Sequence, residues 1–190
     1  RDGLVDASTY GQTKVEIFKL ERESTEKILR EVPKAYNTRI QEILLTALLR
    51  SIGSWVGDGK LYIWHEGHGR EELEEGLDVN RTVGWFTSIY PIYLESSGIG
   101  IGEDIEEVKE SLRKIPKHGI GYGILRYING IEDLKGDNRK PEITFNYLGQ
   151  QIGVKEGSRL LVPIPGPMGD SVDGGNERKV ALEITGEVVD

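Results

Sequence analysis

A short segment, His65–Glu71, places carboxylate, imidazole and guanidinium groups directly after a predicted strand. Glu66 lies at its start, and glycines flank His68, where they would let the backbone approach a bound substrate closely. Burial would raise the pKa of the Glu66 carboxyl toward neutrality, which suits a group that exchanges protons near pH 7. Residue types and spacing alone favour a structural carboxylate over such an acid/base group. The structural alternative is a turn carboxylate paired with Arg70 or Arg81.

Two patterns that resemble known ligand sites have the wrong spacing. His65 and His68 are three residues apart, whereas the zinc-protease pattern places two histidines four apart on one helix. His118 is the only other histidine and cysteine is absent, so we expect no metal. Gly98–Gly102 resembles a phosphate loop but lacks the Gly-Lys-Ser/Thr ending, and acidic residues follow it. We expect this segment to begin a helix.

Length and composition exclude several classes of protein. The chain has 190 residues, the size of one ordinary domain, and a net charge of −8, which argues against nucleic-acid binding. No apolar run approaches the roughly 18 residues of a membrane-spanning helix, so we expect no membrane partner. The lack of cysteine fits a reducing compartment, and we expect a cytoplasmic protein. Because the first residue is Arg1, we expect a piece of a longer chain.

Hydrophobic periodicity predicts an α/β domain with a mixed sheet. The predicted strands cover Lys14–Leu20, Leu61–Trp64, Thr87–Glu95, Glu142–Leu148 and Lys179–Val189. The predicted helices cover Ser24–Glu31, a segment capped by Asn37 or Thr38 and running to Ser54, Asp104–Ile115, and Gly121–Ile128. Pro33 is expected to end the first helix. Leu161–Asn176, rich in proline and glycine, is predicted to be a long loop.

Five motifs occur in a fixed order along the chain. They are Glu42–Leu49, Glu66–Glu71, Arg81–Thr87, Gly119–Gly123 and Phe145–Gln150. This series resembles the later motifs of epimerization domains of non-ribosomal peptide synthetases, which belong to the condensation-domain superfamily. Glu-Gly-His-Gly-Arg-Glu, Arg-Thr-Val-Gly-Trp-Phe-Thr and Phe-Asn-Tyr-Leu-Gly match that family's pattern without a substitution. The resemblance extends from about Val15 to the end of the chain.

The sequence departs from that family in two ways. Glu42 stands where the helix motif usually begins with Asp. The two early motifs are missing, including His-His-x-x-x-Asp-Gly, since the chain contains no adjacent pair of histidines. The resemblance therefore implies that residues 1–190 form the C-terminal lobe of the domain, without its N-terminal lobe. It also implies a chloramphenicol-acetyltransferase-like lobe, with a mixed sheet flanked by helices and a tunnel between the two lobes.

The resemblance implies a reaction. A peptidyl carrier protein presents an aminoacyl or peptidyl thioester on its phosphopantetheine arm. The enzyme removes the α-proton and returns a proton on the other face, which gives a mixture of L and D residues. Glu66 would be one acid/base group, opposite a histidine of the missing N-terminal lobe. No cofactor would bind directly. The expected partners are the carrier protein and the N-terminal lobe, and we expect the isolated chain to be inactive or nearly so.

The same resemblance implies roles for other residues. Asn146 would donate a hydrogen bond to an enolate oxygen, and Tyr147 would donate or relay a proton. The structural alternatives are that Asn146 hydrogen-bonds backbone groups at the strand end and that Tyr147 packs in the core. Arg81 would hold a carboxylate or form a structural ion pair, and Trp85 would line the tunnel or pack in the core. The remaining substrate-binding or supporting positions are His68, Arg70, Gly121 and Tyr122.

Two other functions remain possible at this point. One is a condensation-like lobe that docks a carrier protein without chemistry. The other is a peptide-bond-forming condensation domain, against which the Glu66–Glu71 motif argues. A single lobe should expose an apolar face, so we expect the chain to dimerise, to retain its other lobe non-covalently, or to be a stable proteolytic remnant.

Overall fold

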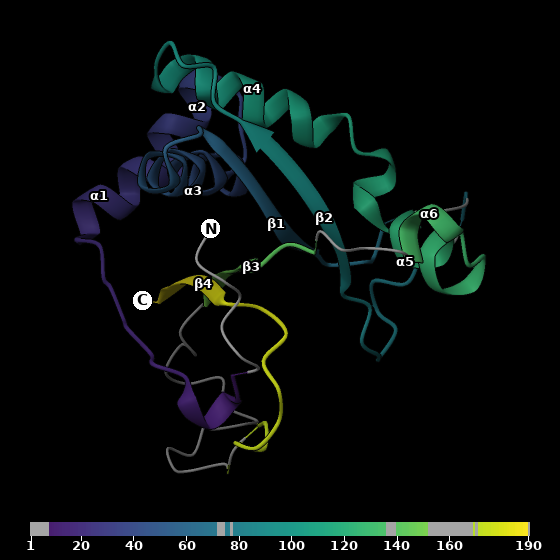
Figure 1. The fold of residues 1–190 in the computed structure, drawn as a ribbon. Helices are drawn as coiled ribbons and strands as arrows, with labels where there is room; N and C mark the ends of the chain where they lie inside the picture. The colour runs from purple at the N-terminus through teal and green to yellow at the C-terminus, as the bar shows by residue number, and fades with distance from the viewer. Residues whose placement is uncertain are drawn as a thin grey trace, which may run out of the picture.

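The computed structural model describes residues 8–71, 75–76, 78–135, 140–151, 169 and 171–189. Within these ranges one mixed sheet has the strand order β2-β1-β3-β4 (Figure 1). Its strands are β1 (Lys60–Gly67), β2 (Ser88–Glu95), β3 (Ile143–Gln151) and β4 (Leu182–Val189). β1 pairs antiparallel with β2 and parallel with β3, and β3 pairs parallel with β4. The sheet is therefore mixed, as the sequence predicted.

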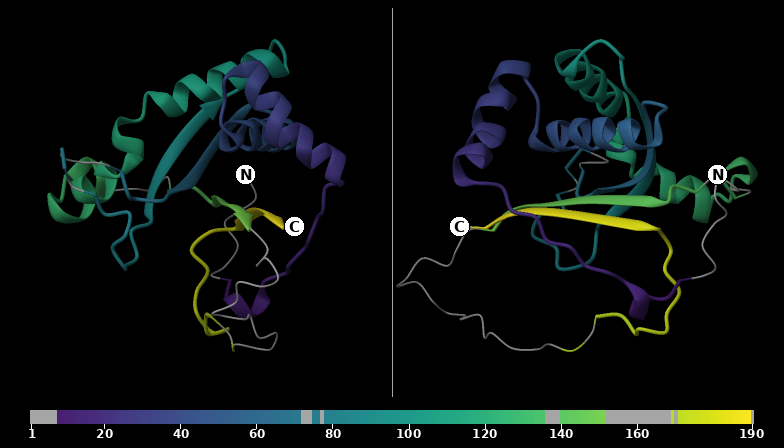
Figure 2. Two further views of the ribbon diagram at one scale, coloured as in Figure 1. Left: turned by 180° about the vertical axis from the view of Figure 1, so that it is seen from behind. Right: turned by 60° about the vertical axis from the view of Figure 1, so that its left-hand side comes forward.

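The two longest helices pack on the same side of β1 and β2 (Figures 1 and 2). These are α3 (Ile40–Val56) and α4 (Ile101–Arg113). The N-terminal helical region comprises η1 (Tyr10–Gln12), α1 (Arg22–Glu26), η2 (Lys27–Glu31) and α2 (Val32–Tyr36). After α4 come η3 (Pro116–Gly119), α5 (Gly121–Gly123), η4 (Ile124–Ile128) and α6 (Glu132–Lys135).

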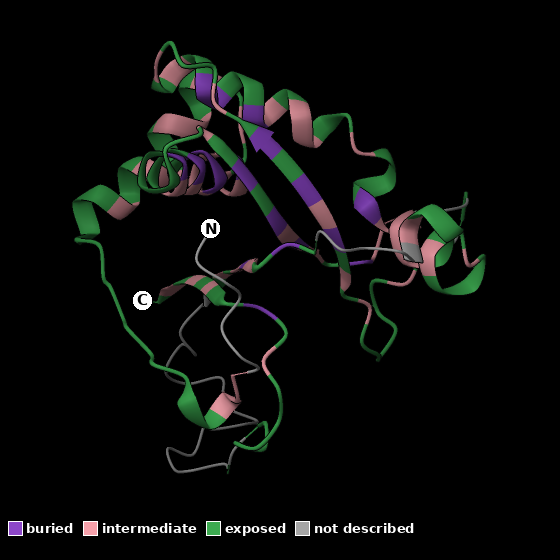
Figure 3. Cartoon of the chain, in the orientation of Figure 1, coloured by how far each residue is buried: buried purple, intermediate pink, exposed green. Residues whose placement is uncertain are grey.

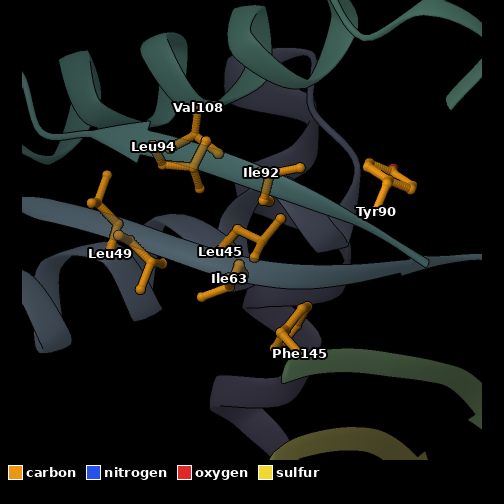
Figure 4. Close-up of a cluster of buried hydrophobic side chains, with 9 residues drawn as sticks. Leu45, Leu49, Ile63, Tyr90, Ile92, Leu94, Val108 and Phe145 are labelled. Atoms are coloured by element: carbon orange, nitrogen blue, oxygen red, sulfur yellow. The ribbon is translucent and has the colours of Figure 1, made fainter. Parts of the chain in front are cut away.

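The core lies between these two helices and one face of the sheet. Alternate residues of β1 and β2 point to this face, because successive side chains of a strand point to opposite faces. Ile63 of β1 lies opposite Ile92 of β2, and Leu45 of α3 and Val108 of α4 cover them (Figure 4). Phe145 extends the core to β3. Colouring by burial shows the same alternation along β2 (Figure 3).

Three local predictions were wrong. Lys14–Leu20 lies outside any strand and its apolar side chains are exposed, because no neighbouring strand pairs with it. Pro33 does not end the first helical segment, because the helical run continues without a break from Arg22 to Tyr36, with the π-helical η2 directly before α2. α3 is not capped by Asn37 or Thr38: its N-cap is Arg39, whose backbone N–H donates to Glu42 at 2.6 Å.

The other predicted elements match to within a few residues, and most of Leu161–Asn176 lies outside the described residues. Gly98–Gly102 leads into α4 as expected, with Gly100 as the N-cap.

Asp104 ties α4 to α3. Its fully buried carboxylate accepts hydrogen bonds from Ser97 N–H at 2.7 Å and from the Ser97 hydroxyl at 2.8 Å, and pairs with Arg50 of α3. Burial by itself would raise the pKa of Asp104, but the hydrogen bonds from Ser97, Arg50 and Ser96 outweigh it and hold the pKa below its ordinary value. Asp104 thus stabilises the start of α4 and its contact with α3.

The opposite face of β1 and β2 carries apolar side chains that are exposed. Tyr62, Ile89 and Tyr93 are all exposed there, as is Leu148 of β3. An exposed apolar surface was expected for a single lobe. Dimerisation through it stays a prediction.

Candidate active site

Two predicted site residues, Glu66 and Asn146, meet on neighbouring strands. His65 of β1 lies opposite Phe145 of β3 in the parallel pair, so the next residue of each strand follows on the other face. There the Asn146 Nδ2 atom donates a hydrogen bond to Glu66 Oε2 at 2.6 Å. The sheet therefore brings together a carboxylate and an amide from motifs that are far apart in the sequence.

The surroundings of Glu66 disfavour its charged form. Partial burial raises the pKa of the Glu66 carboxyl, and the negative charge of Glu183 on β4 raises it further. The alternative pairing with Arg70 or Arg81 is not observed: Arg70 is engaged elsewhere, and Arg81 is exposed. A half-buried carboxyl with a raised pKa has the properties required of an acid/base group.

We expect Glu183→Gln to lower the pKa of Glu66, because the substitution removes a negative charge that opposes ionisation. The pKa can be followed in this chain by carbon-13 NMR titration of the glutamate carboxyls, with the Glu66→Gln variant assigning the signal. Glu95→Gln, on the far end of β2, is the matched control. An unchanged Glu66 titration in the Glu183 variant would show that the two charges are not coupled.

Arg70 joins two of the motifs into one unit. Its guanidinium donates to the backbone carbonyls of Val79, Thr82 and Gly84, the last two at 3.0 and 3.3 Å. It also lies over the Phe86 ring, 4.2 Å from the centroid. Arg70 therefore supports the Arg81–Thr87 loop.

Glycine is required at position 69, where the Glu66–Glu71 motif contacts the Arg81–Thr87 loop. Its φ is +65°, and a Cβ atom there would lie 1.6 Å from the backbone oxygen of Phe86. We expect Gly69→Ala to destabilise the chain by about 2–4 kcal/mol, combining overpacking with left-handed backbone strain. Urea unfolding measures this change. Gly76→Ala is the control, because Gly76 also has a positive φ but has nothing within 4 Å of a Cβ; equal losses in the two variants would exclude the clash.

Tyr147 lies on the opposite face from Glu66. It follows Asn146 in β3, so its side chain alternates to the side of Phe145, where it packs against the core cluster. Burial raises the pKa of its hydroxyl. The structure thus brings Asn146, but not Tyr147, to the Glu66 carboxyl, and it fits the core alternative for Tyr147.

Four other predicted site residues lie on loops and on α5, outside the Glu66–Asn146 pair. His68 is exposed, with its Nε2 3.5 Å from a Glu71 carboxylate oxygen. Trp85 is 92% exposed, so packing in the core is wrong for this residue. Gly121 begins α5, and Tyr122 contacts Trp64 edge to face, with 6.0 Å between ring centroids.

Sequence reasoning missed a buried pair beneath the site. The imidazole of His65 is 6% exposed and its Nδ1 lies 2.9 Å from the Tyr90 hydroxyl. Burial lowers the pKa of His65 to about 4, so the ring is neutral at physiological pH. The alternation Leu61, Ile63, His65 was the signal that places this histidine in the core rather than beside Glu66.

Within the part of the chain that the structure describes, no group of three or more His, Asp or Glu side chains is arranged to hold a metal ion. Among the same residues, every helix is too short or too polar to cross a membrane.

A mixed sheet covered by two helices on one face, with a carboxylate–amide pair on the other, defines an α/β lobe with a candidate acid/base site. The condensation-domain family model matches residues 5–165, and the chain belongs to that family. The expected resemblance is thereby confirmed.

Solved and curated proteins agree with this assignment. The crystal structure of the epimerization domain from the third module of tyrocidine synthetase B matches with a TM-score of 0.86 and 35% identity, over all of this chain and 42% of that one. A linear gramicidin synthase of Brevibacillus parabrevis is 41% identical over 90% of this chain. Bacitracin synthase 1 of Bacillus licheniformis is 40% identical over 84% of it.

The chain spans only 3% of the length of each of these two synthases. The structural match confirms the expected α/β fold, a chloramphenicol-acetyltransferase-like lobe with a mixed sheet and flanking helices. The condensation domain of the Monacolin K polyketide synthase shares the fold at 19% identity, with a TM-score of 0.58.

Proposed function

We propose that this chain is the C-terminal lobe of an epimerization domain that inverts the α-carbon of a carrier-bound aminoacyl or peptidyl thioester. The observation that carries the proposal is the hydrogen bond between Asn146 and Glu66, on a strand pair whose motifs match epimerizing members of the family. Similarity to the tyrocidine synthetase epimerization domain over the whole chain supports it.

The proposed reaction breaks one C–H bond and forms another on the opposite face, and the product has the same bonds as the substrate. A base removes the α-proton, the electron pair passes into the thioester carbonyl to give an enolate, and a proton returns to the carbon from the opposite face. Asn146 holds one oxygen of Glu66, which leaves the other oxygen to take or give the proton. The second acid/base group is a histidine of the N-terminal lobe.

The partners follow from this reaction. A peptidyl carrier protein would bring the substrate on its phosphopantetheine arm, and the N-terminal lobe would close the tunnel. No cofactor would bind directly to the lobe. We propose a cytoplasmic location for such a synthetase.

Exchange of the α-proton with solvent tests the proposal. A carrier protein loaded with an L-aminoacyl thioester is incubated in deuterated water with this chain, or with the two-lobed domain, and deuterium at the α-carbon is measured by mass spectrometry. We expect uptake with the two-lobed domain and almost none with the chain alone. No uptake above the carrier-only control with either protein would overturn the proposal.

A docking module without chemistry is the second candidate. It is favoured by the tip of the Arg81–Thr87 loop, where Val83 and Trp85 are 101% and 92% exposed although Arg70 holds the loop in place. Exposed aromatic residues on a fixed loop are typical of interfaces. Carrier binding without deuterium uptake or dipeptide formation would favour this candidate; a dipeptide product with an acceptor carrier would instead indicate a peptide-bond-forming domain.

A further inference from the structure

A hollow lies on the helix-covered face of the sheet, which is the face opposite to Glu66. It opens where α3 begins, α4 ends and η3 follows, with a volume of about 270 Å³. A wider hollow of about 600 Å³ adjoins it and shares Arg39, Arg113 and His118 with it; we call the two neighbouring hollows together the depression. Glu66 is absent from both linings because it alternates to the other face of β1.

The depression is rich in positive charge, although the chain as a whole carries −8. Arg39, Arg113, Lys114 and Lys117 line it, against the carboxylates of Glu42 and Glu71. Glu42 is already engaged: one oxygen accepts the Arg39 backbone N–H at 2.6 Å, and the other lies 3.9 Å from Arg113 Nε. The local surplus of cations favours an anionic ligand.

His65 adds a buried polar group to the lining of this depression. The residue is 6% exposed and lines the narrower hollow together with Tyr90. Its Nδ1 is paired with the Tyr90 hydroxyl at 2.9 Å, whereas its Nε2 is buried without a hydrogen-bond partner among the described residues. When Tyr90 donates to Nδ1, the ring hydrogen lies on Nε2. An unpaired buried donor is costly, and an oxygen-rich ligand would satisfy it.

We propose that this depression binds a phosphate group, with Arg39 and Lys114 supplying positive charge at the rim and His65 supplying a donor at the floor. Phosphate combines negative charge with several acceptor oxygens, which matches cations and a neutral N–H donor in one place. The group could belong to a phosphopantetheine arm or to free phosphate. The site does not depend on proton exchange at Glu66, since it lies on the other face of the sheet.

Phosphorus-31 NMR titration of this chain at low salt tests the proposal with inorganic phosphate as the probe. We expect saturable binding that weakens about tenfold in Arg39→Gln and in Lys114→Gln, because each removes one charge-assisted contact. The control is Lys179→Gln. Lys179 precedes β4, the strand at the opposite edge of the sheet from β2, so this variant should bind phosphate as the parent does. Shifts that do not saturate, or equal affinities in the rim variants and the control, would overturn the proposal.

Nitrogen-15 NMR of the histidines tests the floor of the site separately. Phosphate should shift the His65 Nε2 signal along the same saturation curve, which a purely structural role of His65 would not produce. Tighter binding of 4′-phosphopantetheine than of inorganic phosphate would support the site and assign it to the carried arm, and equal binding would assign it to free phosphate. Pantetheine without phosphate binding as tightly as phosphopantetheine would contradict the proposal.

Discussion

Glu66→Gln is expected to reduce α-proton exchange by the two-lobed domain about 100- to 10,000-fold, the usual contribution of a general acid/base group. Glutamine keeps the size of the side chain and an oxygen that can accept from Asn146, but it cannot take a proton from carbon. The loss should therefore appear in kcat, with little change in KM for the loaded carrier protein.

The measurement is deuterium incorporation at the α-carbon, with Glu95→Gln as the matched control. Glu95 is also a strand glutamate, but it lies at the far end of β2, opposite Lys60. Exchange at the parental rate in the Glu66 variant would remove Glu66 from the mechanism. A loss of exchange in both variants would indicate damage to the fold instead.

The second large effect is a loss of stability in mild acid caused by His65. The folded pKa is lowered to about 4, whereas an unfolded histidine titrates near 6.5. Between these values the unfolded chain binds the proton and the folded chain does not, so stability is full above pH 6.5 and falls as the pH drops toward 4. The total loss is about 3 kcal/mol, from about 1.4 kcal/mol for each pKa unit.

Urea unfolding at intervals between pH 7 and pH 4 measures this loss. His65→Gln should flatten the fall, although it lowers the stability at pH 7 by removing the bond to Tyr90. His68→Gln keeps the buried histidine and should therefore keep the steep fall. A parental slope in the His65 variant would assign the acid sensitivity to other groups.

Much of the fold could be predicted because periodicity reports burial. The stripe of α3 and the alternation in β2 follow directly from residues that pack in one core. Lys14–Leu20 shows the limit, since it alternates in the same way but has no strand beside it. A segment forms a strand only where another strand can hydrogen-bond with it. Alternation alone therefore could not decide whether Lys14–Leu20 is a strand.

The site was predictable in part for the same reason. Glu66 lies near the end of β1 and Asn146 lies within β3. Their motifs pointed to a shared centre, although only the strand order places them side by side. Tyr147 belongs to the same sequence motif as Asn146. Because successive side chains of a strand point to opposite faces of the sheet, the two residues cannot both face Glu66. Arg70 was expected only as a substrate-binding or supporting residue, because its three carbonyl partners depend on the path of the loop.

The parallel pairing of β1 with β3 has a consequence for how the protein folds. Glu66 and Asn146 are separated by 80 positions, and the chain between them includes β2 and all of α4. Contacts of this range require closure of a long loop, whereas the β1–β2 pair needs a shorter one. We therefore infer that the β1–β2 pair and its helices assemble first. The candidate site would then be completed late in folding, when β3 joins the sheet.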